Sequence, residues 1–236
     1  MSDEYNDQVS KHYAAYRPPI HGLILKQAIE SIKPSFDNGL DIGCGTGLSS
    51  NALAEVCSSV VGIDPSANML ASASSTRGVS FVQGTGDNLP LTDSSVDIIT
   101  FAGSLSYAKS DKLVDEVLRV GNEDVTVVAY DFEVLLDDVL TSLGITLPPS
   151  ASNYNHAENF SEFEVLTEIA VHQSRLVIPV TSEQLAHVLF SSSKRFALLV
   201  ERFGSDYTFD RVVKALGEDR FQEISVDTYY STYRPN

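Results

Sequence analysis

The stretch that decides the fold of this 236-residue chain is Leu40-Asp-Ile-Gly-Cys-Gly-Thr-Gly-Leu48. A short apolar run, Gly39–Ile42, leads into three glycines at alternate positions, and a helix-like stretch begins at Leu48. Glycine reaches positive φ and places no Cβ between the main chain and a ligand. The following helix adds free N–H groups and the positive end of its dipole. The pattern predicts a strand, a loop that holds a polar ligand against the backbone, and a helix.

The spacing of the glycines indicates which ligand the loop holds. Gly43, Gly45 and Gly47 give G-x-G-x-G, whereas a dinucleotide-binding loop has the pattern G-x-G-x-x-G. Leu48 stands where the last glycine of that pattern would fall. Asp64 ends the next apolar run, where it either accepts hydrogen bonds from both hydroxyls of a ribose or serves as a helix N-cap before a proline. Together these features favour a nucleoside without a pyrophosphate.

Outward from this stretch, short apolar runs alternate with helix-like stretches, the arrangement that builds parallel βαβ units. The apolar runs are rich in β-branched residues, which favour strands. The expected strands are Gly39–Ile42, Ser59–Ile63, Val79–Val82, Val96–Phe101 and Val125–Tyr130, and the expected helices between them are Leu48–Cys57, Ala67–Ser74 and Asp111–Val120.

The pattern changes on both sides of this core. Phe163–Val180 and Phe221–Tyr233 have strand composition, a helix is expected over Ile20–Ile32, and Thr181-Ser-Glu-Gln184 has the pattern of a capping box. We therefore expect an α/β fold with a doubly wound, mostly parallel, seven-stranded sheet and a helical cap. The chain is expected to be one domain, residues 1–236, with probable cap and substrate-recognition segments at residues 1–37, 132–160 and 181–216.

Composition and charge limit the classes of function. Hydrophobic residues make up 43% of the chain, enough to fill a core. Sixteen Lys and Arg oppose 32 Asp and Glu, so the net charge of −16 disfavours binding to nucleic acid and to anionic membranes. The amino terminus has no basic segment followed by an apolar one, and no apolar run approaches the roughly 20 residues that cross a bilayer. We predict a cytoplasmic protein.

The cysteines and histidines predict neither a disulfide framework nor a metal site. Cys44 and Cys57 have no partners at zinc-site spacing, and the five histidines are scattered along the chain. We expect two reduced thiols and no bound metal.

Three segments of the chain resemble the class I S-adenosylmethionine-dependent methyltransferases. Leu40–Leu48 matches the glycine motif of that family, Asp64 with Pro65–Met69 matches its acidic motif, and Gly84–Pro90 resembles the segment that closes over adenine. Within the family, the chain is similar to small-molecule enzymes of methyltransferase type 11, related to the trans-aconitate and ubiquinone-pathway methyltransferases. The resemblance covers about residues 38 to 130, and Tyr13–Pro19 resembles an amino-terminal element found in part of the family.

The resemblance implies S-adenosylmethionine as cofactor and gives roles to particular residues. Gly43, Gly45 and Gly47 would border the methionine and ribose parts of the cofactor, and Asp64 would hold the ribose. Relatives often have Asp-Ala where this chain has Thr85-Gly86, so adenine recognition would pass to Asp87 or to the backbone.

Two further residues would also bind the cofactor. Asp41 would contact it or orient the glycine loop by accepting hydrogen bonds from the loop N–H groups. Arg17 would pair with the methionine carboxylate, the alternative being a surface arginine before a proline turn.

The implied reaction is direct in-line displacement of the methyl group by a small-molecule acceptor. The sulfonium supplies the reactivity, so the protein only has to align a nucleophile in a dry pocket. Amines, phenols and carbon acids would need a base, whereas carboxylates and thiolates arrive as anions. The acceptor is expected at the carboxyl ends of the fourth and fifth strands. The candidates there are Tyr107, Asp131 and His156, accompanied by Ser104, Ser106 and Tyr154.

Two alternatives stay open on the residues alone. A nicotinamide-dependent oxidoreductase is disfavoured by the glycine spacing and by the lack of a Tyr-x-x-x-Lys pair. A non-catalytic protein that binds S-adenosylmethionine would carry the same motifs. Phe101–Tyr107 differs from the Asn/Asp-Pro-Pro-Tyr/Phe element of the family's amino-DNA methyltransferases, which favours a small acceptor.

Overall fold

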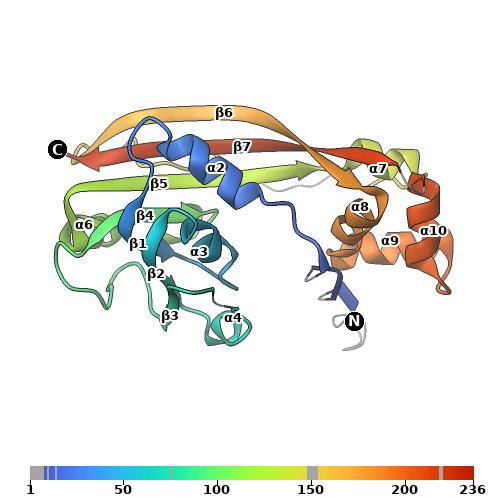
Figure 1. The fold of residues 1–236 in the computed structure, drawn as a ribbon, viewed down its shortest axis with the longest axis horizontal. Helices are drawn as coiled ribbons and strands as arrows, with labels where there is room; N and C mark the ends of the chain where they lie inside the picture. The colour runs from blue at the N-terminus through green and yellow to red at the C-terminus, as the bar shows by residue number, and fades with distance from the viewer. Residues whose placement is uncertain (1–7, 10, 14, 75, 148–153, 218–219) are drawn as a thin grey trace. The chain divides into compact units, whose positions relative to one another are not determined.

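A computed structural model describes residues 8–9, 11–13, 15–74, 76–147, 154–217 and 220–236 (Figure 1). Its centre is a seven-stranded sheet with the strand order β3-β2-β1-β4-β5-β7-β6, which confirms the predicted α/β class and strand number. The strands are β1 (Phe36–Ile42), β2 (Cys57–Asp64), β3 (Val79–Gln83), β4 (Val96–Ala102), β5 (Gly121–Leu135), β6 (Leu166–Thr181) and β7 (Phe221–Pro235).

The first five strands are parallel. β1 pairs with β2 and β4, β2 pairs with β3, and β4 pairs with β5, all in the parallel sense. The chain therefore runs outward from β1 to β3 and then returns to β4 on the other side of β1. In an open α/β sheet, ligands bind at the carboxyl ends of the strands where the strand order reverses in this way. The reversal between β1 and β4 predicts the location of the site.

β7 lies between β5 and β6 and runs antiparallel to both (Figure 1). Ser174 of β6 contacts Thr228 of β7, and Glu168 contacts Tyr233. Residue numbers thus fall along β6 as they rise along β7, as antiparallel pairing requires.

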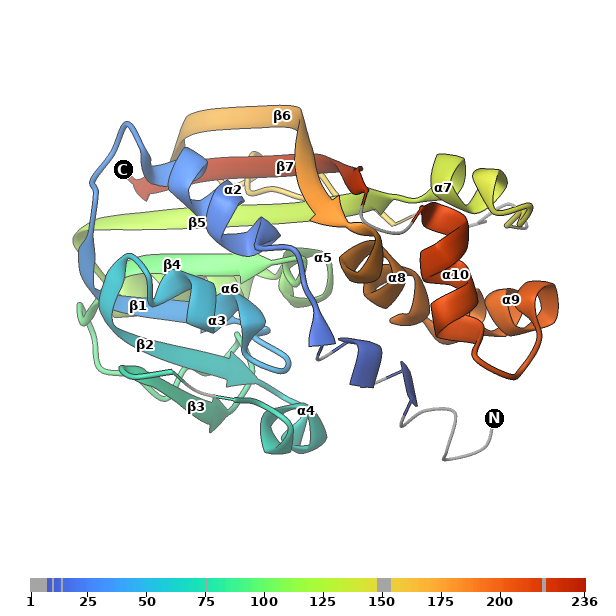
Figure 2. The same cartoon turned by 45° about the vertical axis from the view of Figure 1, so that its right-hand side comes forward.

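Helices cover both faces of this sheet. α2 (Ile20–Ile29) and α3 (Leu48–Leu53) lie on one face, and α6 (Asp111–Val120) lies on the other (Figure 1 and Figure 2). α6 has the predicted bounds, because Ser110 caps its first turn and its apolar side chains at helical spacing, Leu113, Val114 and Val117, are buried. Two short helices, α4 (Ala67–Ala71) and α5 (Leu105–Ala108), follow β2 and β4.

The contacts divide the chain into two compact units. Unit 1 comprises residues 1–18, 133–153 and 175–227, and unit 2 comprises residues 19–132, 154–174 and 228–236. Unit 1 includes much of the predicted cap, although residues 19–37, 132 and 154–160 of the predicted cap segments belong to unit 2. The assignment of residues 1–236 to one domain stays a prediction.

Among its described residues after Phe132, unit 1 contains four helices. They are α7 (Asp137–Ser142), α8 (Ser182–Phe190), α9 (Ser193–Phe203) and α10 (Thr208–Leu216), of which the last three pack on one another. α8 begins with the predicted capping box: the Gln184 N–H donates to the Thr181 hydroxyl, and the Thr181 N–H donates to the Gln184 side chain.

Several predicted bounds were wrong for tertiary reasons. The helix expected to reach Cys57 ends at Leu53, because Cys57 already begins β2. β5 extends to Leu135, since β7 on its other side is 15 residues long, so Asp131 lies within β5 and not after it. Residues 148–153 of the predicted cap segment 132–160 lie outside the described residues.

The sequence analysis also gave expectations about the two cysteines and about membrane-spanning helices. Cys44 and Cys57 are both free thiols, as expected. In the described part of the chain, none of the helices has the length and apolar character needed to cross a membrane.

Candidate functional site

A cavity of about 480 Å³ opens in unit 2 at the carboxyl ends of the parallel strands, where the strand order reverses. Its volume lies within the range typical of small-molecule sites. The cavity is formed by the ends of β1, β2 and β4, by the segment after β3 and by α5. Its lining residues are Ile42, Gly43, Ile63, Asp64, Pro65, Gly84, Thr85, Gly86, Asp87, Ala102, Gly103, Ser104, Tyr107 and Ala108.

The glycine loop is tied to β2 by its own N–H groups. The N–H groups of Gly43 and Cys44 donate to the Ile63 carbonyl at 2.7 and 3.0 Å, and that of Gly45 donates to Asp64 Oδ2 at 2.9 Å. These donors are therefore engaged within the protein, in contrast to the expectation that they hold the ligand. The loop shapes the cavity by its path, and Gly43 lines it.

Two loop glycines are required for different reasons. Gly43 has a φ of 75°, and a Cβ there would collide with the side chain of Ser104. Gly45 has a φ of 53°, and a Cβ there would meet no atom within 4 Å. Close packing excludes a side chain at Gly43, whereas only the backbone conformation disfavours one at Gly45.

Asp64 lines the cavity and is 9% exposed. Its Oδ1 accepts the Ser66 N–H at 2.8 Å, in addition to the bond from Gly45 to Oδ2. A carboxylate has about four acceptor positions, so two stay available for ribose hydroxyls. The N-cap of α4 is Ser66, which accepts the Met69 N–H, so the alternative that Asp64 is that N-cap is wrong.

Asp41 is fully buried and lies outside the cavity lining. Its Oδ2 accepts hydrogen bonds from the hydroxyls of Ser49 and Ser50, each at 2.6 Å, and its Oδ1 accepts one from Thr100 at 3.0 Å. Burial raises the pKa of this carboxyl, and the three hydroxyl donors oppose that shift. These contacts tie β1 to α3 and β4, through side-chain hydroxyls and not through the loop N–H groups that the sequence analysis expected.

The segment after β3 contributes Thr85, Gly86 and Asp87 to the cavity wall. Asp87 Oδ1 accepts a hydrogen bond from the Ser110 hydroxyl at 2.7 Å, which fixes its carboxylate beside the cavity. This position is compatible with a carboxylate that accepts from an adenine amino group.

Arg119, on α6, binds residues 89–93, which follow that segment. Its guanidinium donates to the carbonyls of Leu89 and Leu91 and pairs with Asp93 and Glu116. The sequence analysis did not identify this role, because the partners Leu89, Leu91 and Asp93 lie 26 to 30 positions earlier in the chain.

The three residues predicted to lie beside the methyl acceptor, Tyr107, Asp131 and His156, lie close together in unit 2. Tyr107 lines the cavity, and its ring centre lies 5.9 Å from that of Tyr154. Tyr154 donates its hydroxyl hydrogen to the Gly103 carbonyl at 2.8 Å. His156 Nδ1 lies 2.9 Å from Asp131 Oδ2. Among the accompanying candidates, Ser104 lines the cavity and donates to the Ile42 carbonyl, and Ser106 bonds to Tyr154.

The segment that forms this cavity is similar to known proteins. Residues 40–129 match the family model described as "Methyltransferase domain". Over residues 40–129 the chain is therefore similar to methyltransferase domains. The cofactor that such a domain implies is S-adenosylmethionine.

Individual relatives agree with this assignment. The uncharacterized methyltransferase YcgJ of Bacillus subtilis is 34% identical over 108 residues, which are 43% of this chain and 43% of YcgJ. CRG1 of Saccharomyces cerevisiae, described as a probable S-adenosylmethionine-dependent methyltransferase, is 26% identical over 125 residues, or 50% of this chain and 43% of CRG1. The matched region thus spans about half the length of these curated relatives.

One solved structure shares the fold over almost the whole chain. It is a candidate type II methyltransferase from Anaeromyxobacter dehalogenans, with a TM-score of 0.64 and 18% identity. The similarity covers 94% of this chain and 98% of the other, and it shows the fold alone.

Arg17 belongs to unit 1, outside the methyltransferase domain. Its guanidinium stacks on the Tyr13 ring, and its Nη2 is buried without a hydrogen-bond partner among the described residues. Burial lowers the pKa of Arg17 to about 10. Its contact with a methionine carboxylate stays a prediction.

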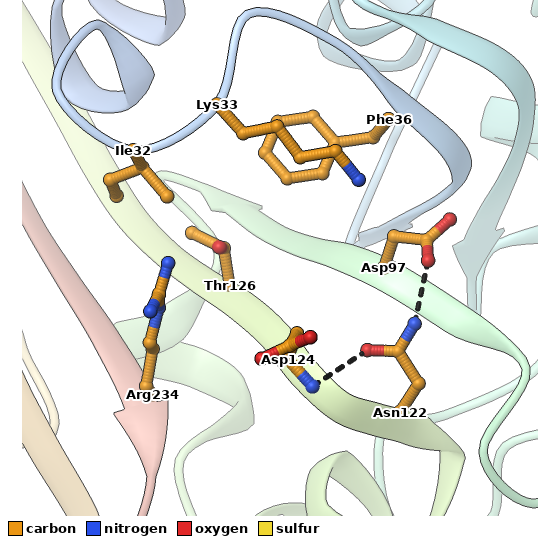
Figure 3. A pocket seen from close by; sticks show the side chains of 8 residues that line it. All are labelled: Ile32, Lys33, Phe36, Asp97, Asn122, Asp124, Thr126 and Arg234. Carbon is orange, nitrogen blue, oxygen red and sulfur yellow. Dashed lines mark hydrogen bonds between the residues drawn. The ribbon is translucent and has the colours of Figure 1, made fainter.

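A second cavity, of about 360 Å³, lies at the opposite, amino-terminal edge of the methyltransferase strands (Figure 3). Asp97 accepts from Asn122 on one oxygen and from the N–H groups of Asp37 and Asn38 on the other. Its carboxylate therefore holds the chain together at this edge. The glycine-loop cavity, at the edge where ligands bind in such sheets, is the candidate functional site.

Proposed function

We propose that this chain transfers a methyl group from S-adenosylmethionine to a small-molecule acceptor by direct in-line displacement. The observation that carries the proposal is the cavity at the reversal of strand order, walled by the Gly43 loop and by the carboxylates of Asp64 and Asp87. It lies within the segment that matches the methyltransferase family.

The residues of the cavity suit the parts of this cofactor. Asp64 retains acceptor positions for the ribose hydroxyls, and Asp87 would accept from the adenine amino group. Carboxylates at the cavity wall also favour a cationic sulfonium, because opposite charges attract strongly in a partly buried site. The cofactor supplies an activated methyl group, while the chain binds and orients both reactants and excludes water.

We propose that the acceptor is neither a nucleic acid nor a membrane lipid. Support comes from the net charge of −16, which repels polyanions. The two free thiols fit a reducing compartment, so we place the reaction in the cytoplasm.

Titration calorimetry with S-adenosylhomocysteine tests the cofactor assignment. We expect binding by the wild type, at least about tenfold weaker binding by Asp64→Asn because the carboxylate charge and its acceptors are lost, and unchanged binding by Asp115→Ala, an exposed carboxylate on α6. Binding of NAD in place of S-adenosylhomocysteine would contradict the proposal. Methyl transfer to a compound panel separates an enzyme from a non-catalytic binding protein.

A further inference from the structure

Asp131 and His156 form an oriented carboxylate–imidazole pair. Asp131 Oδ2 lies 2.9 Å from His156 Nδ1, and Asp131 Oδ1 accepts the Phe132 N–H at 2.7 Å, which fixes the carboxylate. A carboxylate at Nδ1 favours the tautomer with the proton on that nitrogen. Nε2 is then an unprotonated acceptor that can take up a proton.

Two tyrosine rings hold the imidazole plane. The Tyr154 ring crosses it at 76° with ring centres 4.8 Å apart, and the Tyr229 ring stacks on it at 15° with centres 5.8 Å apart. The His156 side chain is 28% exposed, so a small molecule can reach it. An imidazole with a fixed tautomer, a fixed plane and a partly exposed side chain can act as a general base.

The pair stands beside the wall of the cofactor cavity. Gly103 lines that cavity, and a Cβ at Gly103 would lie only 3.1 Å from Asp131 Oδ1. Tyr154 bonds to the Gly103 carbonyl, and Tyr107, which also lines the cavity, lies next to Tyr154. The pair therefore lies directly behind the part of the cavity wall that the end of β4, Gly103 and α5 form.

We propose that His156 is the general base for the methyl acceptor and that Asp131 positions it. The acceptor is then a protic nucleophile, a hydroxyl compound or an amine, and not a carboxylate or a thiolate. This inference rests on the proposed function.

The proton and the electrons balance in this step. The acceptor passes its O–H or N–H proton to His156 Nε2 while its lone pair forms a bond to the transferred methyl carbon. The bond from that carbon to sulfur breaks, and its electron pair stays on sulfur. Asp131 stabilises the imidazolium, which later releases the proton to water. An acceptor that arrives as an anion needs no such base, and the Asp131 charge would repel it.

The flat tyrosine rings of Tyr107 and Tyr154 suggest ring compounds as probes. Phenol, aniline, thiophenol and benzoate share one ring and differ only in the attacking group. Formation of S-adenosylhomocysteine measures transfer to each. We expect the wild type to methylate phenol or aniline, and we expect His156→Gln to lower kcat/KM for that compound at least about 100-fold, as loss of a general base does.

A matched histidine provides the control. His172 also lies in unit 2 and stacks on a tyrosine, Tyr230, with ring centres 5.2 Å apart. His172→Gln should leave the rate within about twofold of the wild type. The loss in His156→Gln should shrink as the pH is raised, since hydroxide replaces the base. Three outcomes would overturn the proposal: unchanged transfer in His156→Gln, transfer only to thiophenol or benzoate, and transfer to none of the four compounds.

Nitrogen NMR of the histidines tests the pair without any acceptor. We expect the His156 ring with its proton on Nδ1 in the wild type, and mixed tautomers in Asp131→Asn. A proton on Nε2 in the wild type would mean that the pair only anchors residues 154–160 to β5. Failure of S-adenosylhomocysteine to bind would instead defeat the proposed function, and the NMR result would stand separately.

Discussion

Thr100 and Thr126 are buried on the neighbouring strands β4 and β5 but differ in how their hydroxyls are satisfied. Thr100 donates to the buried Asp41 carboxylate, which also orients the glycine-bearing strand. Thr126 Oγ1 has no hydrogen-bond partner among the described residues, although the residue is only 1% exposed. A buried polar group without a partner costs free energy, whereas one bonded to a charge stabilises the fold.

Substitution by valine should therefore have opposite effects at these two sites. We expect Thr126→Val to raise the free energy of unfolding by about 1 kcal/mol, because it removes an unsatisfied hydroxyl at nearly constant shape. We expect Thr100→Val to lower it by about 2 kcal/mol, because Asp41 loses a donor. Urea denaturation at pH 7 measures both, and changes of the same sign would contradict the argument.

The glycine loop allows a second comparison at the residue scale. Gly45→Ala should lower the free energy of unfolding by about 1 kcal/mol, the cost of a left-handed backbone with a Cβ in open space. Gly43→Ala should cost more, because its Cβ also collides with Ser104. Chemical denaturation measures the free energy of unfolding of both variants. Equal decreases would show that packing at Gly43 does not matter.

Among the elements, α8 and α9 differ in how they begin. Thr181 and Gln184 form a complete capping box at α8, whereas the Ser192 side chain makes no capping hydrogen bond at α9. The box was predictable because it depends on residues three positions apart. The short α5 was not, since its four residues carry no helical period.

The two N-caps should respond differently to alanine. We expect Thr181→Ala to lower the free energy of unfolding by about 1 kcal/mol, since an orphan N–H loses its acceptor. Ser192→Ala should stay within about 0.5 kcal/mol of the wild type. Thermal unfolding followed by circular dichroism compares them, and a larger effect at Ser192 would count against the capping argument.

At the scale of the whole molecule, stability should depend on pH through an aromatic cluster in unit 1. His12 Nδ1 lies 2.9 Å from His187 Nδ1, and both rings pack against Phe209. Burial lowers the pKa of both histidines, and the charge of His187 lowers the pKa of His12 further, while Glu183 opposes the shift at His187. Between the lowered pKa and the ordinary value of about 6.5, the unfolded chain binds more protons than the folded chain.

The stabilising contribution of these histidines is therefore complete above about pH 6.5 and is lost as the pH falls through their lowered pKa values. We expect the midpoint temperature of thermal unfolding to decrease when the pH is lowered from 7.5 to 5. The decrease should be smaller in His187→Phe, which removes one titrating ring and keeps an aromatic side chain. Parallel pH profiles of the two proteins would refute this account.

The amino-acid sequence by itself determined the parallel strands, the glycine loop, Asp64 at the end of β2 and the bounds of α6. These features depend on residues a few positions apart, where side-chain period, β-branching and glycine conformation act directly. Only the tertiary structure decided that Asp131 meets His156, that Arg119 holds the segment after β3, and that three hydroxyls surround Asp41. Those contacts join residues from separate strands, helices and loops, and such groups meet only after the helices have packed on the sheet.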